Sequence, residues 1–399
     1  METNEAAGRR VRIGISGSYG GMNLGDEAIL EGILGQIRAT ISADVTVFSM
    51  NPSETMARHQ VERAISARAL TRREMTPEIR DLDLFVLGGG GILYDRDASK
   101  YLREVTIARD LGVPVILYAI SAGPLDTQSA RKSVRDALNV TAPTVVTVRD
   151  RLGYRLLEDI GVSTEIHLTA DPAFLLEPEE LPVTALESEG VDFNRRLVGF
   201  SVREPGPAAP DIRPDEYYAL LANAADYIVE RYGAEVVFVP MEKTDVQHSH
   251  AVVAHMNNAE RAEILRRKYS PRQILDLMGR FEFAVGMRLH FLIFAALRGT
   301  PFAALPYASK VSGLLEDLDM GTPPLGSIGI GQLIARIDRS WDARADIRAT
   351  IGKRLPELRA RAAQTNQLLL ALLGCAIGKA KPEAMTERTG YTSQPIEPH

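Results

Sequence analysis

The stretch VRIGISGSYGGMNLGDEAIL, residues 11–30, decides how the chain is interpreted. Residues 11–16 form an apolar, β-branched run, which indicates a buried strand. A glycine-rich bend follows at 17–25, and the next residues predict a helix whose first turn carries Asp26 and Glu27. A strand, a glycine-rich bend and a helix in this order favour an α/β fold with its ligand near the bend.

The same alternation of strands and helices continues along most of the chain. Strands are predicted at 11–16, 45–48, 82–87, 113–119, 144–148, 164–168, 197–202, 235–240, 281–285 and 301–305. Helices are predicted at 28–41, 100–111, 131–139, 151–160, 215–232, 246–256, 271–279, 289–298 and 310–318. Such alternation is typical of parallel sheets covered by helices on both faces. We therefore predict two doubly wound, Rossmann-like domains that face a cleft.

The domain boundaries follow from breaks in this pattern. The stretch 177–195 is rich in Pro and Glu and lacks periodicity, which is typical of a linker. We predict flexible tails at 1–9 and 379–399, an N-terminal domain at 10–180, a linker at 181–195, a C-terminal domain at 196–340 and a C-terminal helix at 341–378.

The C-terminal helix has an apolar stripe and many basic residues. Apolar residues recur at helical spacing at positions 347, 351, 355, 358, 362 and 369. One interpretation is that the helix packs back across both domains. The other is that its basic face also contacts anionic lipid at the inner membrane surface.

Composition narrows the class of protein. The chain has 399 residues, of which 25% are charged and 45% hydrophobic, and its net charge is −6. This balance argues against nucleic-acid binding. The N-terminus lacks the apolar core of a secretory signal, and Cys375 is the one cysteine, so no internal disulfide is possible. These features predict a cytoplasmic, enzyme-sized protein.

Two glycine-rich segments follow predicted strands. The bend at 17–25 lacks the G-x-G-x-x-G spacing, and the chain has no G-x-x-x-x-G-K-[ST] motif, so a common nucleotide clamp is not predicted. Asp26 and Glu27 either stabilise the helix dipole or accept hydrogen bonds, or a proton, from sugar hydroxyls. Four glycines at 88–91 follow another strand, where they allow a ligand or backbone to come close.

Basic residues follow several strands of the predicted sheets. Arg149, Arg203 and Arg288 each come after a strand, although Asp150 and Glu204 offer nearby partners. Three arginines in one cleft would repel one another, so their convergence predicts a bound anion. His290 at a strand–helix turn is a candidate proton donor, with Lys310 nearby in the predicted cleft.

The remaining histidine cluster favours no metal site. His248, His250 and His255 have a spacing that zinc sites use, but no cysteine supports them and the stretch is polar. We predict a solvated helix face there and no metal.

Taken together, these motifs resemble the polysaccharide pyruvyl transferase family. The resemblance rests on NLGDEAIL (23–30), VLGGGGILYD (86–95), VRD (148–150), ADPAF (170–174), FSVRE (200–204), MRLHFLIFAALRGTPF (287–302) and PYASK (306–310). It implies a glycosyltransferase-B-like arrangement and transfer of the pyruvyl group of phosphoenolpyruvate to a sugar diol, which forms a cyclic ketal. It also implies that Arg203, Arg288, His290 and Lys310 hold the donor. The family often has Asp where this chain has Ala308.

The chemistry of the two substrates fits a division between the domains. Phosphoenolpyruvate is strongly anionic, so its site needs several cations, which the second domain offers with help from Arg149. A sugar is neutral, and we expect Asn23, Glu27, Gly89 and Gly90 to bind it, with Asp26 and His290 catalytic. Arginine and lysine supply the charge, so we expect no cofactor and no metal, with phosphoenolpyruvate as co-substrate.

Two other functions remain open from the sequence. One is a nucleotide-sugar-dependent glycosyltransferase, in which Glu316 would bind ribose hydroxyls. The other is a non-catalytic glycan-binding protein. The acceptor sugar and whether it is lipid-linked stay open as well.

Overall fold

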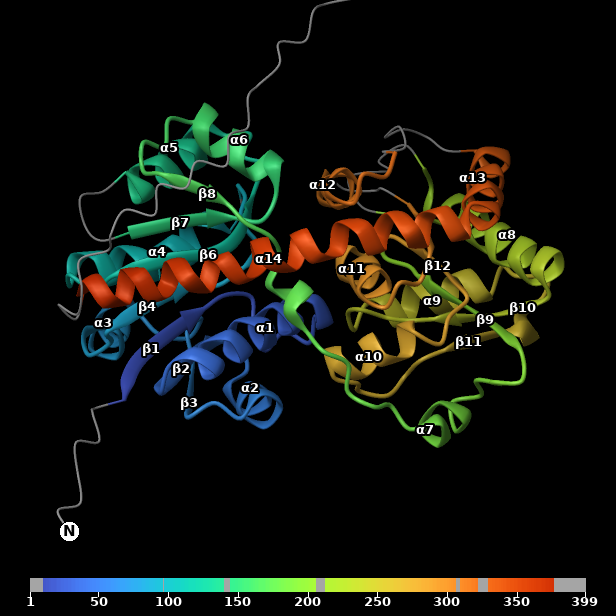
Figure 1. Ribbon diagram of the computed structural model, residues 1–399, viewed down its shortest axis with the longest axis horizontal. Helices are drawn as coiled ribbons and strands as arrows, with labels where there is room; N and C mark the ends of the chain where they lie inside the picture. The colour runs from blue at the N-terminus through green and yellow to red at the C-terminus, as the bar shows by residue number, and fades with distance from the viewer. Residues whose placement is uncertain are drawn as a thin grey trace, which may run out of the picture.

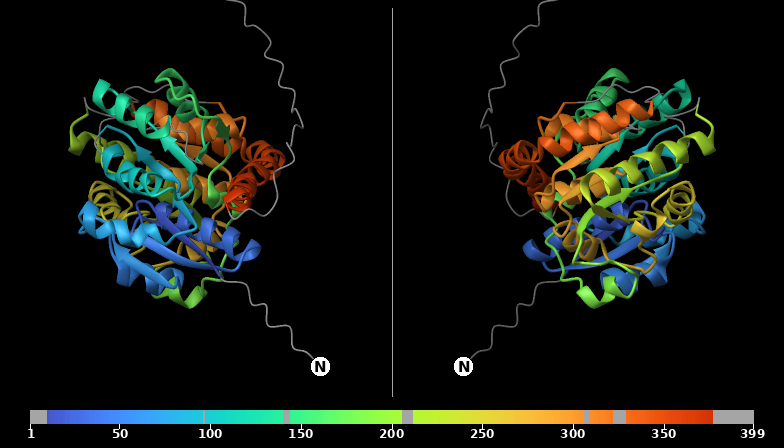
Figure 2. Two further views of the ribbon diagram at one scale, coloured as in Figure 1. Left: turned by 90° about the vertical axis from the view of Figure 1, so that its left-hand side faces the viewer. Right: turned by 90° about the vertical axis from the view of Figure 1, so that its right-hand side faces the viewer.

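The computed structural model describes residues 10–95, 97–139, 144–205, 212–305, 309–321 and 329–376. Position 308 therefore lies outside the described residues. Figure 1 shows two α/β domains side by side, the first in blue to green and the second in yellow to orange. The side views show helices on both sides of the strands (Figure 2). The predicted doubly wound α/β class is confirmed.

The first domain is built on a parallel sheet in the order β3-β2-β1-β4-β6-β7-β8, with β5 paired to β6. Its strands are β1 (Val11–Ser16), β2 (Ala43–Ser49), β3 (Arg63–Ser66), β4 (Leu84–Leu87), β5 (Gly90–Leu93), β6 (Val115–Ala122), β7 (Thr144–Val148) and β8 (Ile166–Leu168). Its helices are α1 (Leu24–Thr40), α2 (Pro52–His59), α3 (Arg72–Arg80), α4 (Ala98–Asp110), α5 (Gln128–Leu138) and α6 (Arg151–Asp159). The strand order reverses between β1 and β4, where doubly wound sheets place ligands.

The second domain repeats this plan with a parallel sheet in the order β11-β10-β9-β12-β13. Its strands are β9 (Arg196–Ser201), β10 (Ala234–Phe238), β11 (Ala262–Ile264), β12 (Phe283–Gly286) and β13 (Phe302–Ala304). Its helices are α8 (Pro214–Tyr232), α9 (Asp245–Val253), α10 (Pro271–Met278), α11 (Leu289–Leu297), α12 (Ser309–Asp317) and α13 (Ile330–Asp342). The short helix α7 (Val183–Glu187) lies in the segment between the two sheets, after the 3-10 turn η1 (Pro172–Leu175).

Most strands of the two sheets were predictable from the sequence because they are apolar runs. β4 and β6 are buried at every residue, as a strand covered on both faces should be. The sequence prediction missed β3 and β11, which are short edge strands of four and three residues. It also missed β5, because two of its four residues are glycines that were assigned to a loop.

The last helix, α14 (Arg344–Ala376), crosses the whole molecule (Figure 1). It packs against β6, β7 and α1 of the first domain and against α11 and α13 of the second. Ile351, Leu358, Ala362 and Leu369 of its predicted stripe are buried. The apolar stripe therefore joins the two domains.

The basic residues of α14 make contacts within the protein. Arg359 pairs with Glu177 at 2.8 Å, and Arg361 pairs with Asp317 at 2.9 Å. Arg354 donates to the main-chain oxygen of Asp317 at 3.1 Å. These contacts favour the packing interpretation of the helix. Over the described residues, every helix is too short or too polar to cross a membrane.

Candidate active site

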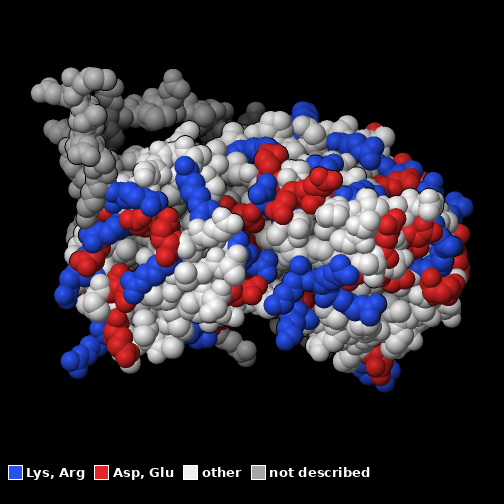
Figure 3. All heavy atoms as spheres, turned by 90° about the horizontal axis from the view of Figure 1, so that it is seen from below, with Lys and Arg blue, Asp and Glu red and all other residues white. Residues whose placement is uncertain are grey.

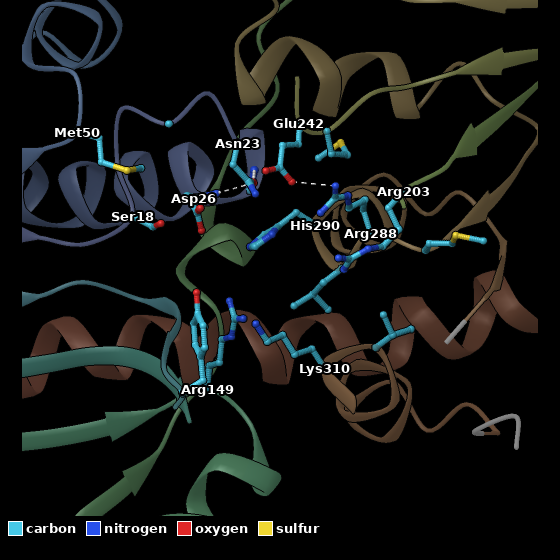
Figure 4. Close-up of a pocket in the computed structure, with 18 residues that line it drawn as sticks. Ser18, Asn23, Asp26, Met50, Arg149, Arg203, Glu242, Arg288, His290 and Lys310 are labelled. Atoms are coloured by element: carbon cyan, nitrogen blue, oxygen red, sulfur yellow. Dashed lines mark hydrogen bonds and ion pairs between the residues drawn. The ribbon is translucent and has the colours of Figure 1, made fainter. Parts of the chain in front are cut away.

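An interdomain cavity of about 330 Å³ lies at the carboxyl ends of both sheets (Figure 4). It is lined by Ser18, Gly21, Asn23, Gly25, Asp26, Met50, Gly91, Tyr94, Arg149, Arg203, Met241, Glu242, Met287, Arg288, Leu289, His290, Lys310 and Val311. The fold thus brings together the predicted residues Asn23, Asp26, Arg149, Arg203, Arg288, His290 and Lys310. Glu27, Gly89 and Gly90 are not among the lining residues.

The N-terminus of α1 forms one wall of the cavity. Asn23 is the N-cap, and its side-chain oxygen accepts hydrogen bonds from the main-chain N–H groups of Gly25 at 2.9 Å and Asp26 at 3.3 Å. This capping explains why the helix starts here. It also occupies the Asn23 oxygen, so a sugar would meet the amide nitrogen of that side chain.

Asp26 carries the most perturbed carboxylate in this wall. Burial raises its pKa to about 6, and the nearby His290 and Lys310 partly oppose the rise. A carboxyl group with this pKa exchanges protons near neutral pH. Asp26 is therefore suited to accept a proton from a hydroxyl group in the cavity.

Glu27 was predicted to bind the acceptor, and the structure places it elsewhere. Its side chain is buried, pairs with His59 at 2.7 Å and accepts a hydrogen bond from the main-chain N–H of Gly20 at 2.8 Å. Because α1 turns Glu27 away from Asp26, one carboxylate faces the cavity and the other fixes the glycine-rich bend from behind.

The four glycines at 88–91 also differ from the prediction. A Cβ atom on Gly88 would lie 1.8 Å from the hydroxyl of Tyr19, and one on Gly89 would lie 3.1 Å from two main-chain oxygens of β6. Gly90 has a φ of +108° and begins β5. These three glycines accommodate the protein itself, so the predicted acceptor role of Gly89 and Gly90 finds no support in their positions.

Two other glycines let the domains touch at the cavity. A Cβ atom on Gly91 would lie 1.9 Å from Nζ of Lys310, and one on Gly25 would lie 2.1 Å from Nδ1 of His290. In each case a side chain of the second domain rests on bare backbone of the first. Glycine is therefore required at both positions for this approach.

Lys310 is held in a basic environment. Burial, together with the nearby Arg149 and Arg203, lowers its pKa to about 8, although Asp26 and Asp150 oppose the fall. Its ammonium group stands near Arg149 in the cavity (Figure 4).

The three arginines are each balanced by a carboxylate of the protein. Nε of Arg288 donates to Asp245 at 3.0 Å, and the same guanidinium pairs with Glu242 at 2.8 Å. Arg203 pairs with Glu204. Arg149 lies 2.5 Å from a carboxylate oxygen of Asp171. We expected that three converging arginines would require a bound anion. This reasoning was wrong, because these carboxylates offset the repulsion between the arginines.

Asp171 links two of the predicted site residues. Its Oδ2 lies 3.4 Å from Nε2 of His290 and also pairs with Arg149. Burial alone would raise the pKa of Asp171, but Arg149 and His290 hold it well below its usual range. The carboxylate is therefore ionised and orients both neighbours.

Three carboxylates at the site were not predicted from the sequence: Asp171, Glu242 and Asp245. Asp171 follows β8 and caps η1, so the rule that ligands meet strand ends would have found it. Glu242 and Asp245 follow β10 after a short loop, and the predicted helix there began one residue too late to include Asp245.

The residues proposed for other roles lie apart from the cavity. Glu316 is exposed and lines a separate surface depression. Nδ1 of His248 forms a hydrogen bond with the Tyr218 hydroxyl at 2.7 Å. Over the described residues, no three His, Cys, Asp or Glu side chains form a candidate metal site.

Comparison with known proteins gives a family and one relative. The family model described as polysaccharide pyruvyl transferase matches residues 23–309. The amylovoran biosynthesis protein AmsJ of Erwinia amylovora is 19% identical over 303 residues, which cover 72% of each chain.

Solved structures with a similar fold are UDP-N-acetylglucosamine 2-epimerases. The enzyme of Methanocaldococcus jannaschii is 12% identical with a TM-score of 0.63, and 91% of this chain matches 99% of that one. The enzyme of Neisseria meningitidis, solved with bound UDP-GlcNAc, is 9% identical with a TM-score of 0.62 over 91% of this chain and 99% of that one. At these identities they show the fold alone, and they confirm the glycosyltransferase-B-like arrangement.

The family match runs from residue 23 to residue 309 and so covers most of the chain. The chain therefore belongs to the polysaccharide pyruvyl transferase family.

Proposed function

We propose that this protein transfers the pyruvyl group of phosphoenolpyruvate to two hydroxyl groups of one sugar in a cell-surface polysaccharide or its precursor. The products are a cyclic pyruvate ketal and phosphate. The observation that carries the proposal is the meeting of Asp26, His290 and Lys310 in one cavity, beside cations from both domains. Proton-transfer groups and anion-binding groups are the two components that this reaction needs.

The donor fits the basic side of the cavity. Lys310 and Arg203 line the cavity, and we assign them to the phosphate and carboxylate groups of phosphoenolpyruvate. Arg288 presents a guanidinium that Asp245 and Glu242 hold in position. The fixed carboxylates keep the arginines in place before the donor arrives, so binding costs little reorganisation.

His290 supplies the proton that starts the reaction. Protonation of the methylene carbon of phosphoenolpyruvate leaves a cation at the adjacent carbon, which its phosphate oxygen stabilises. Asp171, ionised and 3.4 Å from Nε2 of His290, orients the imidazole in the cavity for this transfer.

Asp26 acts on the acceptor. The first sugar hydroxyl attacks the cationic carbon and gives its proton to Asp26, which forms a tetrahedral adduct. The bond from that carbon to the phosphate oxygen then breaks, phosphate leaves with the electron pair, and the new sugar oxygen stabilises the cation that remains. The second hydroxyl then attacks the same carbon, and its proton passes to phosphate or solvent. One donor and one diol give one ketal and one phosphate.

A nucleotide-sugar donor is the rival within this fold. Glu316, the residue suggested for ribose binding, lies outside the cavity. Saturation-transfer NMR with phosphoenolpyruvate and with UDP-sugars separates the two functions, and we expect signals from phosphoenolpyruvate. Phosphate release across a panel of glycans then identifies the acceptor. Release that is absent with every glycan, together with UDP-sugar binding, would favour the rival.

A further inference from the structure

A second pocket lies beside the interdomain cavity. Its volume is about 320 Å³, and residues of both domains line it. Its floor is apolar and consists of Met22, Leu24, Pro240, Met241, Val246, Leu265, Tyr269 and Ile274. Its rim is mostly basic, with Arg58, Lys243, Arg266, Arg267 and Lys268, and it includes one carboxylate, Glu242, which pairs with Arg288 at 2.8 Å. We call it the basic pocket. Figure 3 shows Lys and Arg side chains gathered beside the notch between the two domains on this face.

The basic pocket and the interdomain cavity share one wall. Along the chain, Met22 and Leu24 face the basic pocket, whereas Asn23 and Asp26 face the cavity. The main-chain N–H of Leu24 donates to the oxygen of Met241 at 2.8 Å, which ties this segment to the second domain. Met22 has a φ of +61°, a conformation that a residue with a side chain seldom adopts. A molecule that reaches over this wall occupies both hollows.

The rim cations differ from the arginines of the cavity. Lys243 and Arg267 are exposed, and within the described ranges their side chains make no hydrogen bond or ion pair with the protein. Arg58 and Lys268 are different, because they lie 2.9 Å and 4.0 Å from carboxylate oxygens of Glu54. The cavity arginines have built-in carboxylates, whereas Lys243 and Arg267 have no such partner among the described residues. Such charge favours an anionic ligand and is screened by salt.

We propose that the basic pocket is an acceptor subsite that binds a negatively charged group next to the sugar being modified. The acceptor is then an anionic glycan, with a phosphate or a carboxylate one unit away from the diol. Lys243 and Arg267 meet the anion, and the apolar floor covers the hydrophobic face of the unit that carries it. This inference rests on the proposed function, since it concerns the acceptor of that reaction.

The test compares three acceptors that share one diol-bearing sugar. One is neutral, one carries a uronate as its neighbouring unit, and one carries a glycosyl diphosphate. The variant is Lys243→Glu with Arg267→Glu. The matched control is Lys132→Glu, an exposed lysine on α5 that lies in neither hollow. Acceptor binding is measured by calorimetry without donor, and turnover by phosphate release.

We expect the double variant to raise the KM and the Kd of an anionic acceptor at least about tenfold. Its KM for phosphoenolpyruvate and its use of the neutral acceptor should stay at the wild-type values, and Lys132→Glu should change none of them. If the KM and the Kd rise only for the glycosyl diphosphate acceptor, the ligand of the pocket is a phosphate. If they rise only for the uronate acceptor, the ligand is a carboxylate.

Two results would overturn the inference. In the first, the double variant weakens the binding of charged and neutral acceptors equally. In the second, it leaves the KM and the Kd of both anionic acceptors unchanged. Both results require that the wild-type protein is active. If the proposed function itself fails, the wild-type protein releases no phosphate with any acceptor, so the two failures can be told apart.

Discussion

One carboxylate oxygen, Oδ2 of Asp171, lies 3.4 Å from Nε2 of His290 and 2.5 Å from Arg149. Asp171 is buried shortly after β8 in the first domain, whereas His290 lies in the first turn of α11 in the second. The proposed acid therefore receives its orienting charge from across the domain boundary. In this arrangement the cavity is active only when both domains are in place.

Replacing His290 and replacing Asp171 should have different effects. His290→Ala should lower turnover about 10²–10⁴-fold, because the proton donor is lost, and should leave the Arg149–Asp171 pair intact. Asp171→Ala leaves Arg149 buried without that partner, so it should also lower the free energy of unfolding by about 3–5 kcal/mol. Phosphate release and urea denaturation measure the two effects. Equal stability of both variants would mean that Asp171 does not hold Arg149.

Asp26→Asn should stabilise the protein at neutral pH while it reduces acceptor use. The folded-state pKa of Asp26 is about 6 against an ordinary 3.8, so the folded protein holds a proton that the unfolded chain releases between these values. Stability is lost as pH rises through this window. The neutral Asn avoids the loss, which amounts to at most about 3 kcal/mol above pH 6.

Urea denaturation at pH 7 and pH 4 checks this effect. Asp26→Asn should have a higher free energy of unfolding than wild type at pH 7, and this difference should nearly vanish at pH 4. The affinity of the variant for phosphoenolpyruvate should stay near that of wild type. A variant that is less stable than wild type at pH 7 would contradict the burial of an ionised Asp26.

Lys310 should set an alkaline limit on donor capture. Its pKa is about 8, so the ammonium charge that we assign to phosphoenolpyruvate binding disappears as pH rises through that value. We expect kcat/KM for the donor to fall above pH 8, since this ratio reports groups of the free enzyme. Lys310→Arg keeps its charge at these pH values. Its maximal kcat/KM should therefore be lower than that of wild type, but this ratio should not fall above pH 8. An unchanged alkaline limb in Lys310→Arg would assign the fall to another group.

Gly91→Ala should weaken donor binding through Lys310. The added methyl group would lie 1.9 Å from Nζ, so the lysine must move away from the cavity wall. We expect about a tenfold loss of affinity for phosphoenolpyruvate, equivalent to about 1.4 kcal/mol. Gly35→Ala is the control, because nothing lies within 4 Å of a Cβ atom at that helical position. If both variants bind the donor like wild type, Lys310 does not contact it.

The sequence predicted the cavity better than it predicted the roles of individual residues in it. Strand periodicity placed Arg149, Arg203 and Arg288 at the ends of β7, β9 and β12, because parallel strands bring their carboxyl ends to one edge. The strand–helix turn pointed to His290 and to Lys310 nearby, and the resemblance to the family added a donor-binding role for both. Both lie in the cavity.

Roles that depend on side-chain direction were not predictable. Asp26 and Glu27 are neighbours at the start of α1, and a helix turns successive residues about 100° apart, so only the packed structure shows which one faces the cavity. The partners of the arginines come from distant segments: Asp245 is 43 residues from Arg288, and Asp171 is 22 residues from Arg149. No local pattern marks such pairs.

Transfer of the pyruvyl group can be followed with phosphoenolpyruvate that is labelled with ¹³C at the carbon bearing the phosphate. With an anionic diol acceptor, we expect wild-type protein to convert the enol signal into that of a ketal carbon bound to two sugar oxygens, with one phosphate released per ketal. His290→Ala should slow this conversion about 10²-fold or more. Phosphate release with free pyruvate as the labelled product, or a ketal formed by His290→Ala at the wild-type rate, would contradict the proposed transfer.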